Sequence, residues 1–423
     1  MHQQYSNFTI ELAENADLGF PLFVANIPER FDRPGIYADP GGHYYKDGVE
    51  RWLSFQLAVL NWLINDKSAI PDVLHCHDHH TGLIPFFTKN VAAYRKLAEI
   101  PTIYTIHNGQ YHGAYGWDKL YLLPHFAEEL RGLLDWSGFI NPLATGVKTA
   151  WRVTTVSEGY MEELRHQSVG LEALFWHEQF KCKGIINGID NQVWNPATDP
   201  RITTHLKGTA ISKFKTENKK EIARQFNIDL KKPLFTFIGR LVYEKGADLI
   251  PDLVKQVQRS GLKANFFVLG TGEPYLHEMF KKMSKEMFNF FDTSLEYNET
   301  LAHQLYAGSD FLLMPSRVEP CGLNQMYSCR YGTIPVVRAI GGLKDTIPDL
   351  IESPEEGRGF RFYEFDLDEA FMAIYKAIEL FKNKKQLTFI RKRIMGTDFS
   401  WQNSVKQYIT MYEELVSVSQ PKR

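Results

Sequence analysis

Two blocks of short apolar runs that alternate with helical patterns are the feature that most constrains the fold of this chain. In the first block, roughly 20–190, the expected strands are 21–27 (PLFVANI), 72–77 (DVLHCH), 102–107 (TIYTIH) and 152–157 (RVTTVS). In the second block they are 233–239 (PLFTFIG), 265–270 (NFFVLG), 288–294 (FNFFDTS), 311–316 (FLLMPS) and 334–339 (IPVVRA). Such alternation is typical of parallel sheets with helices on both faces. The sequence therefore predicts two doubly wound α/β domains.

Helical periodicity appears at two places that matter for the organisation. A helix is expected over 50–64, and its apolar residues recur at helical spacing: Trp52, Phe55, Val59 and Trp62. A second amphipathic helix is expected from Ser400, a suitable N-cap, and one of its faces carries Trp401, Val405, Tyr408, Tyr412 and Leu415.

The segment 196–220 is polar, contains Pro, Thr and Lys, and shows little apolar period, which indicates a connector. We therefore expect a first Rossmann-like domain over 1–195, a linker over 196–232, a second Rossmann-like domain over 233–399 and a terminal helix over 400–423.

Composition excludes several classes of partner. The 423 residues carry a net charge of −2, which gives no support for a nucleic-acid partner or an anionic membrane. No apolar run reaches the length of a bilayer span, and the first residues lack the pattern of a signal peptide. The four cysteines, Cys76, Cys182, Cys321 and Cys329, form no CxxC pair. We read them as reduced thiols of a cytoplasmic protein.

Polar clusters follow four of the predicted strands at the point where each strand ends. Asp78 follows 72–77 and His107 closes 102–107, whereas Arg240 and Lys245 follow 233–239. Arg317 and Glu319 follow 311–316. In doubly wound sheets, ligands bind beyond the carboxyl ends of the strands, so these side chains are the candidates for the site.

The run HCHDHH (75–80) invites a metal interpretation, because strand alternation places His75 and His77 on one face. A zinc site usually collects its ligands at recognisable spacings, often with Cys, and no second cluster of that kind exists here. We predict no metal and expect His75 to be a packed or hydrogen-bonded strand residue. Asp78 and His107 are the better candidates for chemistry, since each stands directly before a turn.

Arg240 and Lys245 lie in a short loop framed by Gly239 and Gly246. An Arg fork and a compact Lys charge are a common pair for a diphosphate. The alternative is a solvated surface turn, where most Arg and Lys residues are found.

Glu319 precedes a predicted helix whose first amides, those of Cys321, Gly322 and Leu323, could face an anion. A carboxylate at this place is also compatible with a purely structural role near the positive end of the helix dipole. Carboxylates accept hydrogen bonds from paired sugar hydroxyls, so a nucleotide-sugar would need both the cations and the carboxylate.

Six ordered motifs together resemble one family over nearly the whole chain. They are DVLHCHDHHTGLIP, TIHNGQYHGAYG, GIINGIDNQVWNP, GRLVYEKGADL, MPSRVEPCGLNQMY and YGTIPVVRAIGGLKDT. The chain resembles the bacterial glycogen synthases and plant starch synthases. That resemblance implies the GT-B fold, with two Rossmann-like domains facing a central cleft and a C-terminal helix that crosses back to the first domain.

The resemblance also implies roles for individual residues of the second half. Arg240 and Lys245 match the pair that holds the donor diphosphate, and Glu319 matches the carboxylate that binds hydroxyls of the transferred glucose. The remaining substrate-binding candidates are Asn187, Tyr297, Arg317, Cys321, Gly322, Leu323 and Asn324. Of these, Asn187 matches a contact to the sugar's primary hydroxyl and Tyr297 a ring against the adenine.

In the first half, His107 matches a histidine lining the glucose, and Asp78 an aspartate near the donor sugar and the acceptor end. The implied reaction transfers glucose from ADP-glucose to the non-reducing 4-hydroxyl of an α-1,4-glucan, with retention. Cations and helix-terminal amides would stabilise the departing ADP, so neither a metal nor another cofactor is expected.

Three departures from the family pattern stand out. Tyr327 occupies the position where wider GT-B enzymes have a second glutamate, as in the bacterial glycogen synthases, and Asn324 replaces a common Thr. The family's opening strand and Lys-x-Gly-Gly-Leu loop have no match in MHQQYSNFTIELAENAD, so we expect a first domain that is incomplete at its start.

Two alternatives remain at the level of sequence. One is a related transferase that uses UDP-glucose, because the motifs do not spell out base selectivity. The other is a glucan-binding relative or fragment with impaired catalysis. Against it stands the retention of Arg240, Lys245, Glu319, Asp78 and His107, because an unused site has no reason to keep all five.

Overall fold

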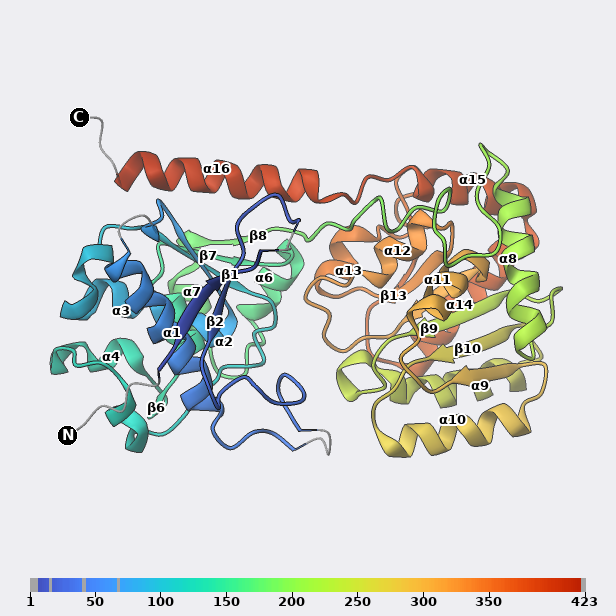
Figure 1. Cartoon of the computed structure of the whole chain (residues 1–423). Coiled ribbons are helices and arrows are strands. Elements are labelled where there is room, and N and C mark those ends of the chain that lie inside the picture. The colour runs from blue at the N-terminus through green and yellow to red at the C-terminus, as the bar shows by residue number, and fades with distance from the viewer. Residues whose placement is uncertain (1–6, 15–16, 40–42, 67–68, 420–423) are drawn as a thin grey trace. The chain divides into compact units, whose positions relative to one another are not determined.

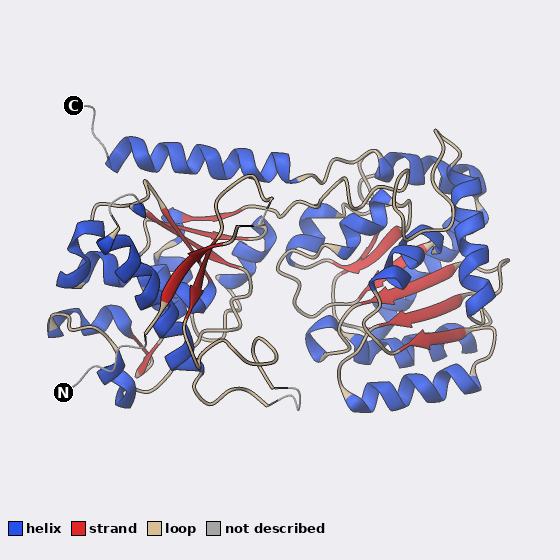
Figure 2. Ribbon diagram, in the orientation of Figure 1, coloured by secondary structure: helices blue, strands red, loops and turns tan. Residues whose placement is uncertain are grey.

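The computed structural model describes residues 7–14, 17–39, 43–66 and 69–419. The chain divides into two compact units. Unit 1 comprises Met1–Thr155, Met161–Gly184 and Tyr408–Arg423, and unit 2 comprises Val156–Tyr160 and Ile185–Gln407. Each unit contains a parallel sheet accompanied by helices (Figures 1 and 2).

The strands of unit 1 are β1 (Thr9–Leu12), β2 (Phe23–Asn26), β3 (Leu74–His77), β4 (Thr102–Ile106), β5 (Asp135–Trp136), β6 (Phe139–Ile140), β7 (Arg152–Thr155) and β8 (Cys182–Gly184). Its helices are α1 (Gly48–Asn65), α2 (Asp78–Thr81), α3 (Ile84–Asn90), α4 (Arg131–Leu134), α5 (Pro142–Thr149) and α7 (Glu172–His177). Its 3-10 helices are η2 (Ala92–Leu97), η3 (Trp117–Leu122), η4 (Glu128–Leu130) and η5 (Gln179–Lys181). Helix α6 (Glu158–Leu164) begins in unit 2 and ends in unit 1.

The main sheet of unit 1 has the order β3-β4-β7-β8, and every neighbouring pair is parallel. The expected strands 72–77, 102–107 and 152–157 are all present in it. The expectation that 21–27 joins this sheet is wrong, because β2 pairs antiparallel with β1 in a separate two-stranded sheet. Gly19, with φ of +74°, lies in the connection that lets the chain reverse between the two strands.

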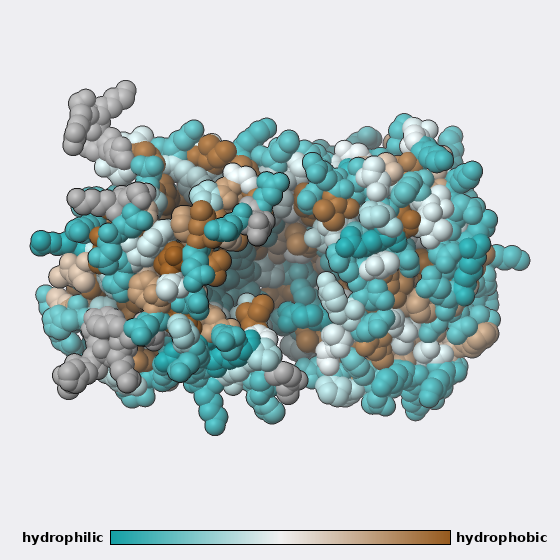
Figure 3. Space-filling view, viewed as in Figure 1, coloured by the Kyte–Doolittle hydropathy of each residue, from teal (hydrophilic) through white to brown (hydrophobic). Residues whose placement is uncertain are grey.

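The β1–β2 hairpin leaves several large apolar side chains in contact with solvent. Phe20 is 60% exposed, and Phe23 and Val24 are each close to half exposed. Figure 3 shows hydrophobic residues, in brown, on the surface over this hairpin. Part of the sequence that precedes and follows β1 lies outside the described residues, so the predicted lack of the Lys-x-Gly-Gly-Leu loop stays an expectation drawn from sequence.

Helix α1 lies where the sequence predicts a helix, but its fully buried residues lie on the face next to the predicted aromatic stripe. Leu53, Leu60 and Leu63 are buried, whereas the predicted aromatic stripe is half-buried. The stripe contacts the segment before it in the chain, since Trp62 packs on Phe23 with ring centroids 4.8 Å apart. The helix therefore packs on two sides, which a single apolar stripe does not reveal.

The strands of unit 2 are β9 (Leu234–Ile238), β10 (Asn265–Leu269), β11 (Phe291–Ser294), β12 (Phe311–Met314), β13 (Ile334–Arg338) and β14 (Phe360–Phe362). Its helices are α8 (Ile211–Gln225), α9 (Ile250–Arg259), α10 (Pro274–Glu286), α11 (Glu299–Gly308), α12 (Asn324–Arg330), α13 (Gly341–Thr346), α14 (Leu367–Lys382) and α15 (Lys384–Met395). Two 3-10 helices, η6 (Tyr243–Lys245) and η7 (Ala247–Leu249), follow β9.

All six strands of unit 2 are parallel and follow the order β11-β10-β9-β12-β13-β14. Numbered within the unit, this is the 3-2-1-4-5-6 order of the doubly wound nucleotide-binding fold. Apolar side chains of both faces are buried, among them Phe235, Phe266 and Leu312. The five strands predicted for the second domain are all present in this sheet.

The expected linker differs most from the structure. Residues 211–225 form helix α8, which packs against α11 within unit 2. Ile211, Phe214 and Ile222 are buried at helical spacing, but Lys215 and Lys219 occupy buried positions between them. Because polar residues stand where apolar ones are expected, the helical period is hidden in the sequence.

Helix α16 (Trp401–Ser419) is the predicted terminal helix. Residues up to Gln407 belong to unit 2, and residues from Tyr408 belong to unit 1. Of the predicted apolar face, Leu415 is buried and Tyr412 half-buried, whereas Trp401 is 44% exposed. Within the described part of the chain, no helix combines the length and apolar character needed to cross a bilayer.

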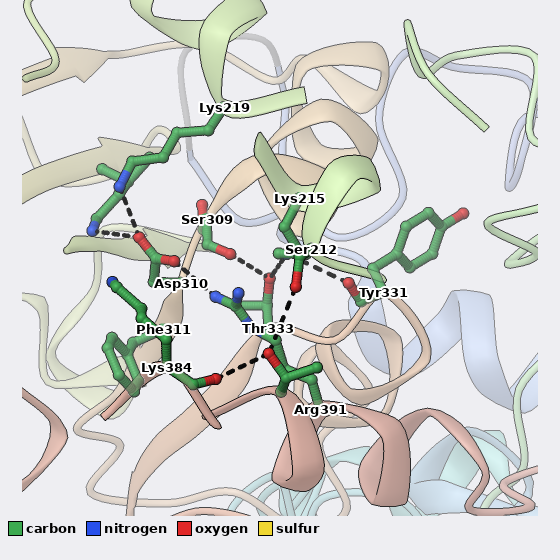
Figure 4. Close-up of polar contacts among 12 residues, drawn as sticks. Ser212, Lys215, Lys219, Ser309, Asp310, Phe311, Tyr331, Thr333, Lys384 and Arg391 are labelled. Carbon is green, nitrogen blue, oxygen red and sulfur yellow. Dashed lines mark hydrogen bonds and ion pairs between the residues drawn. The ribbon is translucent and has the colours of Figure 1, made fainter. Parts of the chain in front are cut away.

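A buried ionic cluster lies at the start of β12 (Figure 4). The Asp310 carboxylate accepts hydrogen bonds from Lys219 Nζ at 2.7 Å and Arg391 at 2.6 Å, and all three side chains are buried. Asp310 also accepts the Leu234 amide at the start of β9. Burial alone would raise the pKa of Asp310, but the charges of Lys219 and Arg391 outweigh it and lower the pKa. The cluster therefore ties α8 and α15 to two central strands.

Lys215 lies in the same region, where it is fully buried. Its Nζ donates to the carbonyls of Tyr306 and Tyr331 and to Thr333 Oγ1 at 2.6 Å. Burial lowers the pKa of Lys215 well below its ordinary value. The hydrogen bonds compensate for the buried polar nitrogen, as such groups require.

Replacing the central carboxylate tests the importance of this cluster. Asp310→Asn leaves Lys219 and Arg391 buried without a counter-charge, so the free energy of unfolding should fall by about 3–5 kcal/mol. The folded pKa of Asp310 is depressed, so its contribution is full above about pH 4 and is lost as the pH falls further. Urea unfolding at pH 7 and below pH 4 measures both effects.

The matched control is Asp252→Asn, which removes an exposed partner of Lys255 and should cost no more than about 1 kcal/mol. Equal losses for the two variants would contradict a stabilising role for the buried cluster.

Candidate active site

Unit 2 brings two of the predicted loops together at the point where its strand order reverses. Strands β9 and β12 are neighbours, although β10, β11 and their helices separate them in the chain. Arg240 and Lys245 follow β9, and Glu319 follows β12. In this topology the crevice beyond the carboxyl ends at the switch point is where ligands bind. The candidate site is therefore built on a rigid parallel pair.

Lys245 and Glu319 form a direct ion pair across these loops. Lys245 Nζ donates to both carboxylate oxygens, at 2.7 and 2.8 Å, and Ser316 Oγ donates to Oε2 at 2.9 Å. Glu319 is only 5% exposed. The predicted cation and carboxylate thus lie side by side and neutralise each other.

Arg240 is arranged differently from Lys245. Its side chain is 61% exposed and contacts Glu244 at 3.3 Å, in an i,i+4 ion pair. The prediction that Arg240 and Lys245 share one anion stays a prediction. In the structure Lys245 faces Glu319, whereas Arg240 keeps most of its guanidinium accessible.

Gly246 lets the loop after β9 turn close to the loop after β12. Its φ of +66° is left-handed, and a Cβ here would lie 2.0 Å from the carbonyl oxygen of Pro315. Only glycine combines this conformation with this approach. The glycine that frames the motif therefore sets the position of Lys245 relative to the end of β12.

The loop from Glu319 to Leu323 packs on the start of α13. The Gly342 amide donates to the Glu319 carbonyl at 3.1 Å, and a Cβ at Gly341 would lie 2.2 Å from the same oxygen. This explains the paired glycines of the AIGGLKDT motif: they allow the backbone of α13 to touch the Glu319 loop.

The predicted amide loop, Cys321 to Leu323, and the neighbouring Asn324 are held by contacts within the protein. Burial raises the pKa of the Cys321 thiol to about 12, so the thiol is neutral and not a nucleophile. A backbone hydrogen bond from Asn187 reaches this thiol, which places the predicted sugar-binding Asn187 beside the loop. Gly322 has φ of +71°, and Asn324 Nδ2 donates to the Ile238 carbonyl at 2.6 Å, joining the end of β9 to α12. Leu323 is the residue that precedes α12.

Arg317, predicted to bind substrate, is occupied by protein contacts. Its guanidinium makes a two-pronged ion pair with Asp248, at 2.6 and 2.7 Å, and lies between the rings of Tyr243 and Phe365. Both ring centroids are 3.6 Å from the guanidinium carbon. In the structure these contacts join the two loops, and the prediction that Arg317 binds substrate stays a prediction.

A pocket of about 310 Å³ opens beside Arg240 at the carboxyl ends of β9 and β10. Its lining includes Gly239, Arg240, Gly270, Tyr297, Asn324 and Tyr327. The Tyr297 ring is 85% exposed and thus able to stack on a planar ligand. The volume lies within the range of small-molecule sites.

One wall of this pocket belongs to an aromatic stack that the sequence did not reveal. Trp194 is sandwiched between Tyr327, at 3.7 Å between centroids, and the buried ring of His303, at 4.0 Å. His303 Nδ1 and Tyr331 Oη both bond Asp199 Oδ2, at 2.7 and 2.5 Å. Burial would raise the pKa of Asp199, but these hydrogen bonds lower it overall. The stack holds Tyr327, which occupies the position where wider GT-B enzymes have a glutamate. The only signal for Trp194 in the sequence was its place in the motif GIDNQVWNP.

In unit 1 the predicted residues Asp78 and His107 are also neighbours, because β3 and β4 pair in parallel. The His107 amide donates to Asp78 Oδ1 at 2.8 Å. Asp78 has a φ of +55°, a strained value for a residue with a side chain, which costs of order 1 kcal/mol. Such strain is concentrated at functional sites, so the geometry supports Asp78 as a site residue.

The histidine run does not assemble into a metal centre. Within the described residues, no group of three or more His, Cys, Asp or Glu side chains could hold a metal ion. His75 is packed, and burial together with His77 and His107 lowers its pKa to about 3. Burial also lowers the pKa of His79 and of His80 to about 4. These rings are therefore neutral at physiological pH.

The Gly246 approach leads to a stability prediction with an internal control. Gly246→Ala should lower the free energy of unfolding by about 1–2 kcal/mol for its left-handed backbone and about 1–3 kcal/mol more for the contact with Pro315. Gly261→Ala has a similar φ of +77° but open space around its Cβ, so only the backbone cost applies. Urea unfolding compares the two, and an equal loss in both would contradict the role of the close approach.

Comparisons with known proteins agree with this geometry. The protein-family model described as the starch synthase catalytic domain matches residues 1–177. The family model described as glycosyl transferases group 1 matches residues 218–388. A glycogen synthase of Flavobacterium johnsoniae is 42% identical over 407 residues, which cover 96% of this chain and 84% of that protein.

Solved structures give the same result. The catalytic domain of starch synthase IV from Arabidopsis thaliana, bound to ADP and acarbose, is 28% identical with a TM-score of 0.83, covering 97% of this chain and 85% of that chain. A sucrose-phosphate synthase from Thermosynechococcus elongatus, at 15% identity and a TM-score of 0.59 over 90% of this chain and 82% of that chain, shares the fold. The predicted GT-B fold and the family resemblance are confirmed, and the chain belongs to the glycogen and starch synthase family of glycosyltransferases.

Proposed function

We propose that this chain transfers glucose from ADP-glucose to the non-reducing 4-hydroxyl of an α-1,4-glucan, with retention. The observation that carries the proposal is the pocket of about 310 Å³ that Arg240 and Tyr297 line at the carboxyl ends of β9 and β10. The relatives named above are a glycogen synthase and a starch synthase that binds ADP and acarbose, which supports the same donor and acceptor here.

The donor is proposed to lie with its adenine against the exposed Tyr297 ring and its diphosphate toward Arg240. An aromatic face suits a purine, and an accessible guanidinium offers two parallel donors to phosphate oxygens. Tyr327 and the Trp194 stack form the rigid wall of the same pocket. A rigid wall reduces the ordering cost of binding.

Bond cleavage places growing negative charge on the departing ADP. We assign Arg240 and Lys245 to stabilise that charge, and Glu319 to accept hydrogen bonds from the glucose hydroxyls. Because Lys245 and Glu319 are already paired, they hold their positions before the donor arrives. Preorganised charges need no rearrangement at the moment of reaction, which is the source of their catalytic effect.

The acceptor side is assigned to unit 1. We propose that His107 contacts the transferred glucose and that Asp78 orients the His107 backbone while lying near the acceptor end. Amides of Cys321, Gly322 and Leu323 are proposed to face the sugar and phosphate, with Asn187 near the primary hydroxyl. No metal or other cofactor enters this mechanism, because the cations of the chain supply the charge.

A cytoplasmic location is part of the proposal. All four cysteines are free, in agreement with a reducing compartment. No nucleic-acid or membrane partner is proposed, since the net charge of −2 favours neither.

The proposal predicts a large kinetic effect at Arg240. Arg240→Ala should lower kcat for glucose transfer by about 10²–10³-fold, the loss typical of one charge-stabilising group. The assay follows labelled glucose from ADP-glucose into glycogen. The control is Arg224→Ala, an exposed arginine on α8 that pairs with Glu221 at the surface, which should retain wild-type activity. An unchanged kcat in Arg240→Ala would refute its assigned role.

The donor itself is tested by competition between ADP-glucose and UDP-glucose in the same assay. Preferential transfer from UDP-glucose would replace the proposed donor and leave the reaction class intact. Binding of glycogen without transfer from either donor would instead favour a glucan-binding relative.

A further inference from the structure

A continuous line of side-chain contacts connects helix α16 to His107 within unit 1. Tyr412 Oη lies 2.7 Å from His75 Nδ1, and the His75 ring stacks on the His77 ring with centroids 4.4 Å apart and planes 21° apart. His77 Nδ1 then lies 3.0 Å from His107 Nε2. The line therefore joins a residue of the last helix to a candidate catalytic residue 305 positions earlier in the sequence.

The first ring of this line is fixed at both nitrogens. His75 Nδ1 contacts Tyr412 Oη, and its Nε2 lies 2.6 Å from Thr105 Oγ1. Thr105 Oγ1 in turn lies 2.5 Å from Thr154 Oγ1 on the next strand. The ring is neutral because burial and the two neighbouring histidines lower its pKa to about 3, so one nitrogen donates and the other accepts. His75 is consequently a rigid support.

The second ring links this support to the candidate site. His77 is exposed at the end of β3, where a free imidazole would sample several rotamers. Stacking on the fixed His75 ring restricts it, and only one proton can lie between His77 Nδ1 and His107 Nε2. When His77 Nδ1 donates this proton, a neutral His107 carries its own proton on Nδ1; when His107 Nε2 donates it, Nδ1 carries none. The tautomer of His77 therefore determines that of His107.

His107 is held from two directions as a result. Its amide donates to Asp78 Oδ1 at 2.8 Å, and its ring contacts His77 through Nε2. Nδ1 is then the ring atom left to face a substrate. An exposed ring without such contacts would have to be ordered when the sugar binds, at a cost in free energy.

We propose that His77 is a positioning residue that sets the orientation and tautomer of His107, and that Tyr412 of α16 secures His77 through His75. This inference rests on the proposed function, since it treats His107 as the residue that contacts the transferred glucose. It gives the terminal helix a part in ordering the active site beyond its packing on unit 1.

The decisive variant is His77→Phe, which keeps a ring for stacking but removes the hydrogen bond. We expect kcat for transfer to glycogen to fall by about 10–100-fold, as a misplaced catalytic group does, with the KM for ADP-glucose changed less than about threefold. His77→Asn restores an amide nitrogen near the position of Nδ1 and should recover most of that loss. Tyr412→Phe should lower kcat less than His77→Phe, and the control Tyr121→Phe, at an exposed tyrosine of η3, should not change it.

A second readout does not depend on activity. With 15N-labelled histidine, and His107→Gln to assign the signal, NMR reports the tautomer of His107 in the full-length chain. One tautomer in the wild type and a mixture in His77→Phe would support the inference; a smaller shift in the same direction is expected for Tyr412→Phe. If His77→Phe does not fold, Tyr412→Phe alone decides.

The inference is overturned if the His107 signals are the same in the wild type and both variants, or if the tautomer changes while kcat does not. A wild-type chain that shows the tautomer coupling but transfers no glucose would instead refute the proposed function. The two failures are therefore distinguishable.

Discussion

The pairing of β9 with β12 is the constraint on which the rest of unit 2 depends. These strands are distant in the chain, and their adjacency creates the reversal of strand order at which two loops leave in the same direction. Lys245 and Glu319, 74 positions apart, can form an ion pair only because of this adjacency. Gly246 then allows the loop after β9 to contact the loop after β12. As a result, Lys245 Nζ lies 2.7 Å from the Glu319 carboxylate.

Ion pairs lie before and after strand β12, and the two pairs differ in their access to solvent. At its start, Asp310 is fully buried and paired with Lys219 and Arg391, which ties surrounding helices to the sheet. Beyond its other end, Glu319 is almost buried but paired with a lysine that retains solvent contact. The first arrangement rigidifies the strand, whereas the second keeps a charged pair where a ligand can reach it. Rigid support of this kind is what precise placement of catalytic groups requires.

In unit 1, neutral imidazole rings rather than charged pairs hold the candidate site residues in place. Burial keeps the histidines that follow and line β3 unprotonated, so they can stack and share protons without repelling one another. The hydrogen bond from the His107 amide to Asp78 and the His77–His107 contact hold His107 at the end of β4. The proposed positioning of His107 would thus connect the packing of α16 to the chemistry of the site.

The sequence by itself determined the elements and the candidate residues, because apolar runs, turn glycines and motif spacing are local properties. It predicted five of the six strands of unit 2, missing β14, and it predicted the place of Arg240, Lys245 and Glu319 after two of them, and the family. It could not reveal α8, whose buried face carries Lys215 and Lys219, or the antiparallel partner of β2. Nor could it reveal that the Arg317 guanidinium pairs with Asp248 and lies between the rings of Tyr243 and Phe365. The stacking of Trp194 on His303 was also hidden. Those outcomes depend on contacts between residues far apart in the chain, which only tertiary packing decides.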